Sequence, residues 1–248
     1  MGAIIGSFFN MLIYRLPNGI SLINPKRSVC PKCATTIKWQ HNIPLFSYLY
    51  LLGKCSYCKN KIPLRYFFVE LLTATITLLL FIKFSLSFDF FLYLAFCYIL
   101  LLLSFIDLDF KAVPDYLLIL VLLVALSTQY DDLFKVMQNG MLFAGGIVLI
   151  ELFVTFYIQN IKTKITKNKN LEDQKALGDG DIPIIASIGI VLGVELGMIA
   201  LFLAALFTII PSIYNSFFKN EIETPFIPFL SLGFISALLL EEYLLSII

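Results

Sequence analysis

Long hydrophobic stretches separated by short charged segments dominate this chain of 248 residues. Hydrophobic residues make up 59% of the chain and charged residues only 14%, and the mean hydropathy is +0.89. A soluble core needs far less apolar surface, so the sequence predicts a polytopic membrane protein. We expect an all-α fold with seven to eight transmembrane helices. The seven clear candidate spans are residues 67–84, 90–106, 116–130, 139–159, 182–194, 196–214 and 228–247.

The segment from Ala3 to Tyr14 is the candidate for an eighth span. Its 12 residues, at ~1.5 Å each, are too few to cross ~30 Å of hydrocarbon. Neither a basic n-region nor an Ala-x-Ala cleavage site follows Met1, which argues against a signal peptide. We interpret residues 1–14 as a short first membrane segment, either truncated or interfacial.

Basic residues are distributed unevenly along the chain. The segment from Ile13 to Leu64 contains eight Lys or Arg residues and no Asp or Glu. The positive-inside rule therefore predicts that this segment is cytoplasmic. Counting spans forward from it leaves only Lys83 and Lys135 on the outer side. The same count puts Asp107 and Asp181 at the cytoplasmic ends of their spans, level with each other.

Four of the five cysteines lie in this basic segment as two Cys-x-x-Cys pairs, with 21 residues between the pairs. Two such pairs can supply four thiolates in a tetrahedron, and their separation is close to that of zinc ribbons. Disulfides are the alternative, but the cytoplasm is reducing. The pattern predicts a structural zinc site in a small cytoplasmic loop, residues 15–66, ahead of a transmembrane core, residues 67–248. The expected ligands are Cys30, Cys33, Cys55 and Cys58.

Carboxylates at the edges of two spans are the main candidates for chemistry. A carboxylate at a membrane boundary is costly to place there, and Asp107 and Asp181 come from separate segments. Asp107 and Asp109 lie about 200° apart on a helix, so only one of them can face the interior. For Asp115, which follows Pro114, and for Asp181, a helix N-cap is the alternative to a chemical role.

If Asp107 and Asp181 meet, charge repulsion keeps a proton on one of them, and the pair can act as acid and base on a water molecule. That is the chemistry of an aspartic protease. Gly178 and Gly180 would let the chain approach another helix or a bound peptide closely. The sole histidine, His41, lies in the predicted zinc loop, and neither a Gly-x-Ser-x-Gly nor a His-Glu-x-x-His motif occurs.

Several short motifs follow one another along nearly the whole chain. They are Gly6-Ser-Phe-Phe-Asn10, Ile13-Tyr-Arg-Leu-Pro17, the two cysteine pairs, Asn42-Ile-Pro-Leu-Phe-Ser47, Gly53-Lys-Cys55, Arg65-Tyr-Phe-Phe-Val-Glu70, Ile106-Asp107 through Pro114-Asp115, and Gly178-Asp-Gly-Asp181. In this ordered series the chain resembles the bacterial type IV prepilin peptidases. These leader peptidase/N-methyltransferases are intramembrane aspartic proteases of the GxGD type.

The resemblance implies cleavage of the basic leader of type IV prepilins or type II pseudopilins, after a glycine at the cytoplasmic membrane boundary. It puts the catalytic pair on Asp107 and Asp181. It also implies S-adenosylmethionine-dependent methylation of the new N-terminus, with Gly53 and Glu70 as candidate residues. We expect a multi-pass protein of the bacterial inner membrane whose active site and zinc loop face the cytoplasm. Its expected partners are the prepilin substrates and membrane lipid, and not nucleic acid.

Two features depart from the family pattern. The first span is shorter, and His41 stands before Asn-Ile-Pro, where an acidic residue is common. Three other functions stay open. A peptidase without methyltransferase activity fits the same motifs. A transporter or channel would predict carboxylates near the midplane and repeated halves, whereas the sequence has boundary carboxylates and no evident repeat. Only the aspartate pair argues against a scaffold that holds pilin subunits without cutting them.

Overall fold

A computed structural model describes residues 1–22, 28–30, 32–129, 132–162, 178–215, 217 and 224–246. The described residues form helices and turns, with two isolated β-bridges and no longer strand among them. Four helices are long and apolar enough to cross a bilayer, and two shorter helices are also apolar. The predicted all-α membrane fold is therefore confirmed. The cationic residues assigned to the cytoplasm at Lys26, Arg27 and Lys219, and within residues 163–177, lie outside the described residues.

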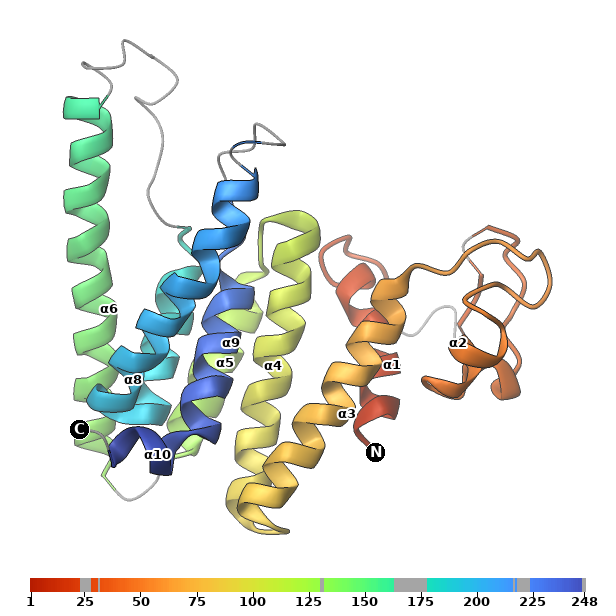
Figure 1. Cartoon of the computed structure of the whole chain (residues 1–248), viewed down its shortest axis with the longest axis horizontal. Coiled ribbons are helices and arrows are strands. Elements are labelled where there is room, and N and C mark those ends of the chain that lie inside the picture. The colour runs from red at the N-terminus through yellow and green to blue at the C-terminus, as the bar shows by residue number, and fades with distance from the viewer. Residues whose placement is uncertain are drawn as a thin grey trace. The chain divides into compact units, whose positions relative to one another are not determined.

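The contacts divide the chain into two compact units, Met1–Phe110 and Lys111–Ile248, and each is described by itself. The first unit contains α1 (Gly2–Arg15), α3 (Leu64–Phe84) and α4 (Phe88–Phe110). Helix α3 packs against both α1 and α4 (Figure 1). The loop between α1 and α3 carries the 3-10 turn η1 (Trp39–Asn42) and the short helix α2 (Phe46–Tyr50). The predicted spans 67–84 and 90–106 lie within α3 and α4.

Glycines bring the backbones of α1 and α3 into contact. A Cβ atom added to Gly2 would lie 2.7 Å from the carbonyl oxygen of Thr73 and 2.8 Å from Cα of Ala74. One added to Gly6 would lie 2.7 Å from Cα of Glu70. The Gly-x-x-x-Gly spacing puts both glycines on one face of α1, as in close helix pairs within membranes. This contact sets the position of α1 on α3.

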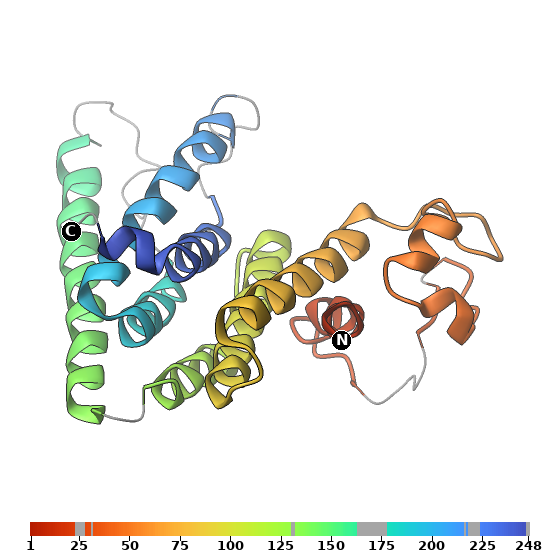
Figure 2. The same cartoon turned by 60° about the horizontal axis from the view of Figure 1, so that its bottom comes forward.

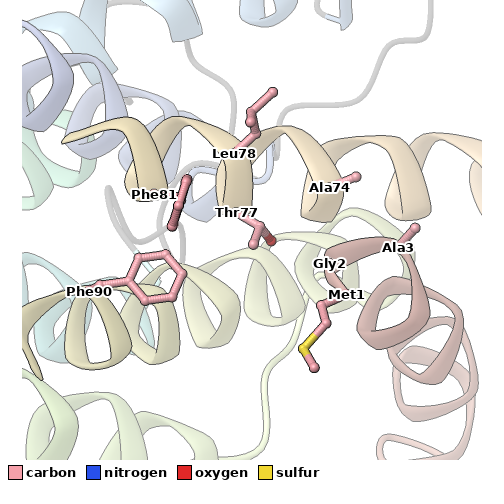
Figure 3. Close-up of a pocket in the computed structure, with 8 residues that line it drawn as sticks. All are labelled: Met1, Gly2, Ala3, Ala74, Thr77, Leu78, Phe81 and Phe90. Carbon is pink, nitrogen blue, oxygen red and sulfur yellow. The ribbon is translucent and has the colours of Figure 1, made fainter. Parts of the chain in front are cut away.

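An open groove with a volume of about 290 Å³ lies between α1, α3 and α4 at the start of α1 (Figure 3). Its lining includes Met1, Phe81 and Phe90, and Thr77 contributes a hydroxyl group to it. That hydroxyl lies 2.6 Å from the hydroxyl of Tyr98 on α4. The other side chains that line the groove are apolar.

The second unit consists of helices and contains the longest helix of the described chain. Its elements are α5 (Asp115–Ser127), α6 (Leu133–Phe156), which continues into the π-helical turn η2 (Tyr157–Lys162), α8 (Asp181–Tyr214), α9 (Ile227–Leu239) and α10 (Glu241–Leu245). Helices α5, α6 and α9 all pack against α8.

Helix α8 is bent sharply at Gly193, which has φ 74° and ψ −171°. Few side chains tolerate this backbone conformation, so a glycine is favoured here. The bend divides α8 into two arms that run in different directions (Figures 1 and 2), and it lies next to the predicted boundary between residues 182–194 and 196–214. The ring of Phe143 on α6 packs against both arms: a Cβ atom added to Gly197 would lie 2.6 Å from Cζ of that ring, and Gly189 is equally tight against it.

The predicted single span over residues 228–247 is wrong. Helix α9 ends at Leu239, Leu240 leaves helical geometry with φ −97° and ψ 12°, and α10 begins at Glu241. Apolar composition alone predicted one helix. The adjacent acidic residues Glu241 and Glu242 instead stand in the first turn of a new helix, where its N-terminal dipole favours negative charge.

We expect Gly6→Leu to destabilise the protein, because the added side chain has no room against α3. Overpacking of this kind typically costs about 1–3 kcal/mol. Thermal unfolding of the purified protein in detergent measures the effect. Ile4→Phe is the matched control, because Ile4 is 65% exposed on the same helix, and it should leave the melting temperature nearly unchanged. Equal melting temperatures for the two variants would contradict the described contact.

Candidate functional site

The two Cys-x-x-Cys pairs lie on similar hairpin turns. The first turn is closed by the bridge between Val29 and Thr36, and the second by the bridge between Lys54 and Lys61. In each turn the residue that follows the hairpin tip has a positive φ, 52° at Ala34 and 58° at Lys59. In each, the first cysteine of the pair makes two backbone hydrogen bonds across the turn.

The four sulfurs meet. The Sγ atoms of Cys30, Cys33, Cys55 and Cys58 all lie within 4.8 Å of one another, and those of Cys30 and Cys58 are 3.9 Å apart. All four predicted ligands are therefore brought together into a cluster that could hold a metal ion. Four thiolates are the donor set of structural zinc sites.

The thiols of this cluster do not ionise independently. Hydrogen bonds from the side chain and backbone of Thr35 lower the pKa of Cys33 to about 6. At Cys58 the backbone N–H of Asn60 favours the thiolate, but desolvation and the three other thiols oppose it and raise the pKa to about 11. A cation among the sulfurs would remove this conflict, because it stabilises several thiolates at once.

Glu70 connects the cysteine-bearing loop to α3. This residue is only 8% exposed, and its Oε2 accepts a hydrogen bond of 2.8 Å from the backbone N–H of Leu45. Leu45 has φ 63°, a conformation that a leucine adopts only when its surroundings hold it. The carboxylate therefore fixes the start of α2.

Gly53 fixes the other end of α2. Its φ is 65°, and its N–H donates to the carbonyl oxygen of Tyr48 at 2.9 Å. A Cβ atom added to Gly53 would lie 2.8 Å from the Tyr48 hydroxyl, which itself donates to the carbonyl of Ile62. The Tyr48 ring also packs against Phe67 of α3, with 5.5 Å between ring centroids. Glu70 and Gly53 thus hold opposite ends of one short helix.

Asp107 and Asp109 face in different directions, as their spacing predicts. Asp107 is 8% exposed in the last turns of α4. Asp109 is exposed and forms an ion pair with Arg65 at the start of α3. Asp107 is therefore the buried carboxylate, while Asp109 joins the ends of two helices.

Asp181 is the first residue of α8 and is 7% exposed. Its Oδ2 accepts a hydrogen bond of 3.1 Å from the N–H of Gly178, while its own N–H donates to the Gly178 carbonyl at 3.0 Å. The N-cap position belongs to Gly180, with no side-chain capping bond. The capping alternative for Asp181 is therefore wrong, because the carboxylate is held by the turn before the helix.

The two glycines of this turn provide space. Gly180 has φ −73°, which any residue can adopt, but an added Cβ atom would lie 2.8 Å from Cγ2 of Val113. One added to Gly178 would lie 3.2 Å from Oδ2 of Asp181. The close approach expected from these glycines is present, and at Gly180 it does not depend on an unusual backbone conformation.

The secondary aspartates have other surroundings. Asp115 is the first residue of α5, and Pro114 is its N-cap with no side-chain capping bond, so the capping alternative is wrong here too. Asp179 is exposed. Asp107 belongs to the unit of residues 1–110 and Asp181 to the unit of residues 111–248.

Two further polar contacts were also not predicted. One is the Arg65–Asp109 ion pair; its only sequence signal was that both residues were expected at the same end of neighbouring spans. The other involves Asn10, which is 2% exposed and donates to the carbonyl of Tyr66 at 3.1 Å. A lone asparagine inside an apolar segment gives such a signal, because a buried amide needs a partner.

Comparison with known proteins covers most of the chain. Residues 1–84 match the family described as Bacterial Peptidase A24 N-terminal domain, and residues 94–213 match the Type IV leader peptidase family. A Vibrio cholerae protein named Prepilin leader peptidase/N-methyltransferase is 33% identical over 199 residues, which are 77% of this chain and 75% of that protein. The Neisseria gonorrhoeae protein of the same name is 29% identical over 86% of this chain and 79% of its own.

An Escherichia coli O78:H11 protein named Type 4 prepilin-like proteins leader peptide-processing enzyme is 32% identical over 97% of this chain and 91% of its own length. No solved structure matches the chain.

We expect Gly180→Ala to destabilise the protein by about 1–3 kcal/mol, because the new methyl group overlaps Val113. Gly146→Ala on α6 is the matched control, since nothing lies within 4 Å of a Cβ atom there, and alanine in a helix gains about 0.5–1 kcal/mol over glycine. Thermal unfolding in detergent should therefore shift in opposite directions for the two variants. A stabilising effect at Gly180 would contradict the packing described for this turn.

Proposed function

Because the chain belongs to the prepilin leader peptidase/N-methyltransferase family, we propose that it is a membrane-embedded aspartic endopeptidase. Its substrates are type IV prepilins or type II pseudopilins, which carry a basic leader, a glycine at the cut and a hydrophobic helix. The observation that carries this proposal is the match to relatives of this name over most of the chain, including both aspartate segments.

Asp107 and Asp181 are the proposed catalytic pair. Both are buried carboxylates at helix ends, and Asp181 is held by its own turn. Two carboxylates a few ångströms apart share one proton, because both cannot ionise cheaply. The ionised one takes a proton from water as the water oxygen attacks the carbonyl carbon. The protonated one gives its proton to the leaving nitrogen as the C–N bond breaks, which leaves a leader carboxylate and a new amine.

The proposed orientation puts this chemistry on the cytoplasmic side of a multi-pass inner-membrane protein. The excess of Lys and Arg between Ile13 and Leu64 supports it. A prepilin has its basic leader on the same side and its helix in the bilayer, so its scissile bond lies at the boundary where Asp107 and Asp181 are expected.

We propose a structural zinc ion bound by Cys30, Cys33, Cys55 and Cys58. The cluster of four sulfurs fits this metal in donor type and number. With four protein ligands, the zinc ion would have no open coordination position for a water molecule. When bound, zinc supplies folding energy to the loop, residues 15–66, which is too small for a hydrophobic core. Residues 67–248 then form the protease core.

The same loop is the proposed place of the second activity, methyl transfer from S-adenosylmethionine to the new N-terminal amine. Gly53 and Glu70 are the residues proposed for that site. They support it by holding the two ends of α2, which gives the loop a defined surface beside α3. The names of the relatives include this activity. The alternative is a peptidase that cleaves but does not methylate. The mass of the product distinguishes the two, because methylation adds to the mass of the cleaved peptide.

We expect Asp107→Asn and Asp181→Asn each to lower cleavage by at least about 10²–10⁴-fold, the usual contribution of acid–base catalysis. Incubating the purified protein with a synthetic prepilin and S-adenosylmethionine, followed by mass spectrometry, reads cleavage and methylation as separate mass changes. Both variants should keep the normal melting temperature and still methylate a pre-cleaved peptide. Asp115→Asn and Asp179→Asn are the controls and should cleave nearly normally. Near-normal cleavage by either catalytic variant would refute the pair.

We expect the purified protein to contain one zinc ion per chain, measured by elemental analysis. Cys55→Ser combined with Cys58→Ser should lose the metal, and methylation should fall at least as severely as cleavage, because both catalytic carboxylates lie outside the loop. Cys97→Ala is the matched control: this cysteine is buried in α4, away from the cluster, and the variant should keep its zinc. A metal-free, fully stable wild-type protein would end the zinc proposal.

A further inference from the structure

A group of large apolar side chains is exposed on the cysteine-bearing loop. Trp39 is 75% exposed, Phe46 74%, Leu49 60%, Tyr50 83% and Leu52 81%. Phe46, Leu49 and Tyr50 have the i, i+3 and i+4 spacing that puts side chains on one helix face. We call these five residues the aromatic face. So much exposed apolar surface in one short segment marks an interaction site.

Helix α2 lies at a defined depth along α3. Leu45, just before α2, is bonded to Glu70, and the Tyr48 ring packs on Phe67. Glu70 is six residues beyond the first residue of α3, Leu64, or about 9 Å along the helix axis. Both views show α2 beside the N-terminal end of α3 (Figures 1 and 2). Helix α3 is long and apolar enough to span the bilayer, so a segment attached this close to its N-terminal end lies at the membrane boundary and not in bulk water.

Charge distinguishes the possible occupants of this face. The segment from Ile13 to Leu64 contains no Asp or Glu. Lys38, next to Trp39, and Lys54, two residues after Leu52, are both exposed. A basic leader peptide or a second copy of this loop would be repelled. Anionic lipid headgroups would be attracted, and Trp and Tyr favour the interface because each has an apolar ring and a polar atom.

We propose that the aromatic face docks the zinc loop onto the headgroup layer of the same membrane, with Lys38 and Lys54 on anionic headgroups. The loop then has two attachments to the bilayer region: Glu70 on the α3 side and the aromatic face on the lipid side. This inference depends on α3 spanning the membrane and not on the proposed catalytic activity.

The chain provides its own probe, because Trp39 is its single tryptophan. The full-length protein is reconstituted at one copy per nanodisc, in phosphatidylcholine alone or mixed with phosphatidylglycerol. We expect lipids brominated near the headgroup to quench Trp39 fluorescence and acrylamide in the buffer to quench it weakly. Lys38→Gln with Lys54→Gln should abolish the extra lipid quenching seen with phosphatidylglycerol, since each lysine favours the docked loop roughly five-fold near an anionic surface.

A pair of double variants tests the face itself. Leu49→Ser with Tyr50→Ser should reduce quenching by brominated lipid and increase quenching by acrylamide, whereas Leu49→Met with Tyr50→Phe keeps the apolar area and should behave as wild type. Zinc content verifies that the loop is intact in both.

Strong acrylamide quenching of the wild type, with none from brominated lipid, would overturn the proposal. So would protection of Trp39 that appears only when a synthetic prepilin is added, which assigns the face to substrate. Protection confined to discs with two copies overturns it in favour of self-association.

Discussion

The hydrogen bond from Leu45 to Glu70 determines where the cysteine-bearing loop lies. A buried carboxylate near the end of a membrane helix is costly, and this one is compensated by a backbone N–H from a separate segment. Without it, the positive φ at Leu45 and the start of α2 would lose their only hydrogen bond to α3 among the described contacts. Together with the packing of Tyr48 on Phe67, this contact sets the depth of α2 and of the aromatic face along α3.

The sequence allowed several features to be predicted because they depend on local patterns. Hydropathy predicted the spans within α3 and α4, and the spacing of the cysteines predicted a cluster that the four sulfurs form. The period of a helix predicted that Asp107 and Asp109 would face apart, and one is buried while the other pairs with Arg65. Each of these predictions needed only residues within one element or one repeated motif.

Other features could not be predicted because they depend on contacts between distant segments. The N-cap alternative for Asp115 and Asp181 was reasonable from position alone, but capping depends on backbone geometry to within one residue, and Pro114 and Gly180 occupy the caps. The break at Leu240 is hidden in an apolar run. Glu70 was selected by resemblance, whereas its bond to Leu45 spans 25 residues and has no local signature.

The angle of the bend at Gly193 determines where the arm of α8 that begins at Asp181 places this residue. That arm runs from residue 181 to residue 192 and is about 18 Å long. If the arm tilted by ~10° about the bend, the carboxylate at its other end would move by about 3 Å. A displacement of only ~1 Å can cost a catalytic site about 10²-fold in rate. Phe143 packs beside the bend, against both arms, and so restrains that angle. The position of the Asp181 carboxylate therefore depends on how the Phe143 ring packs, although that ring belongs to another helix and lies at the opposite end of the arm.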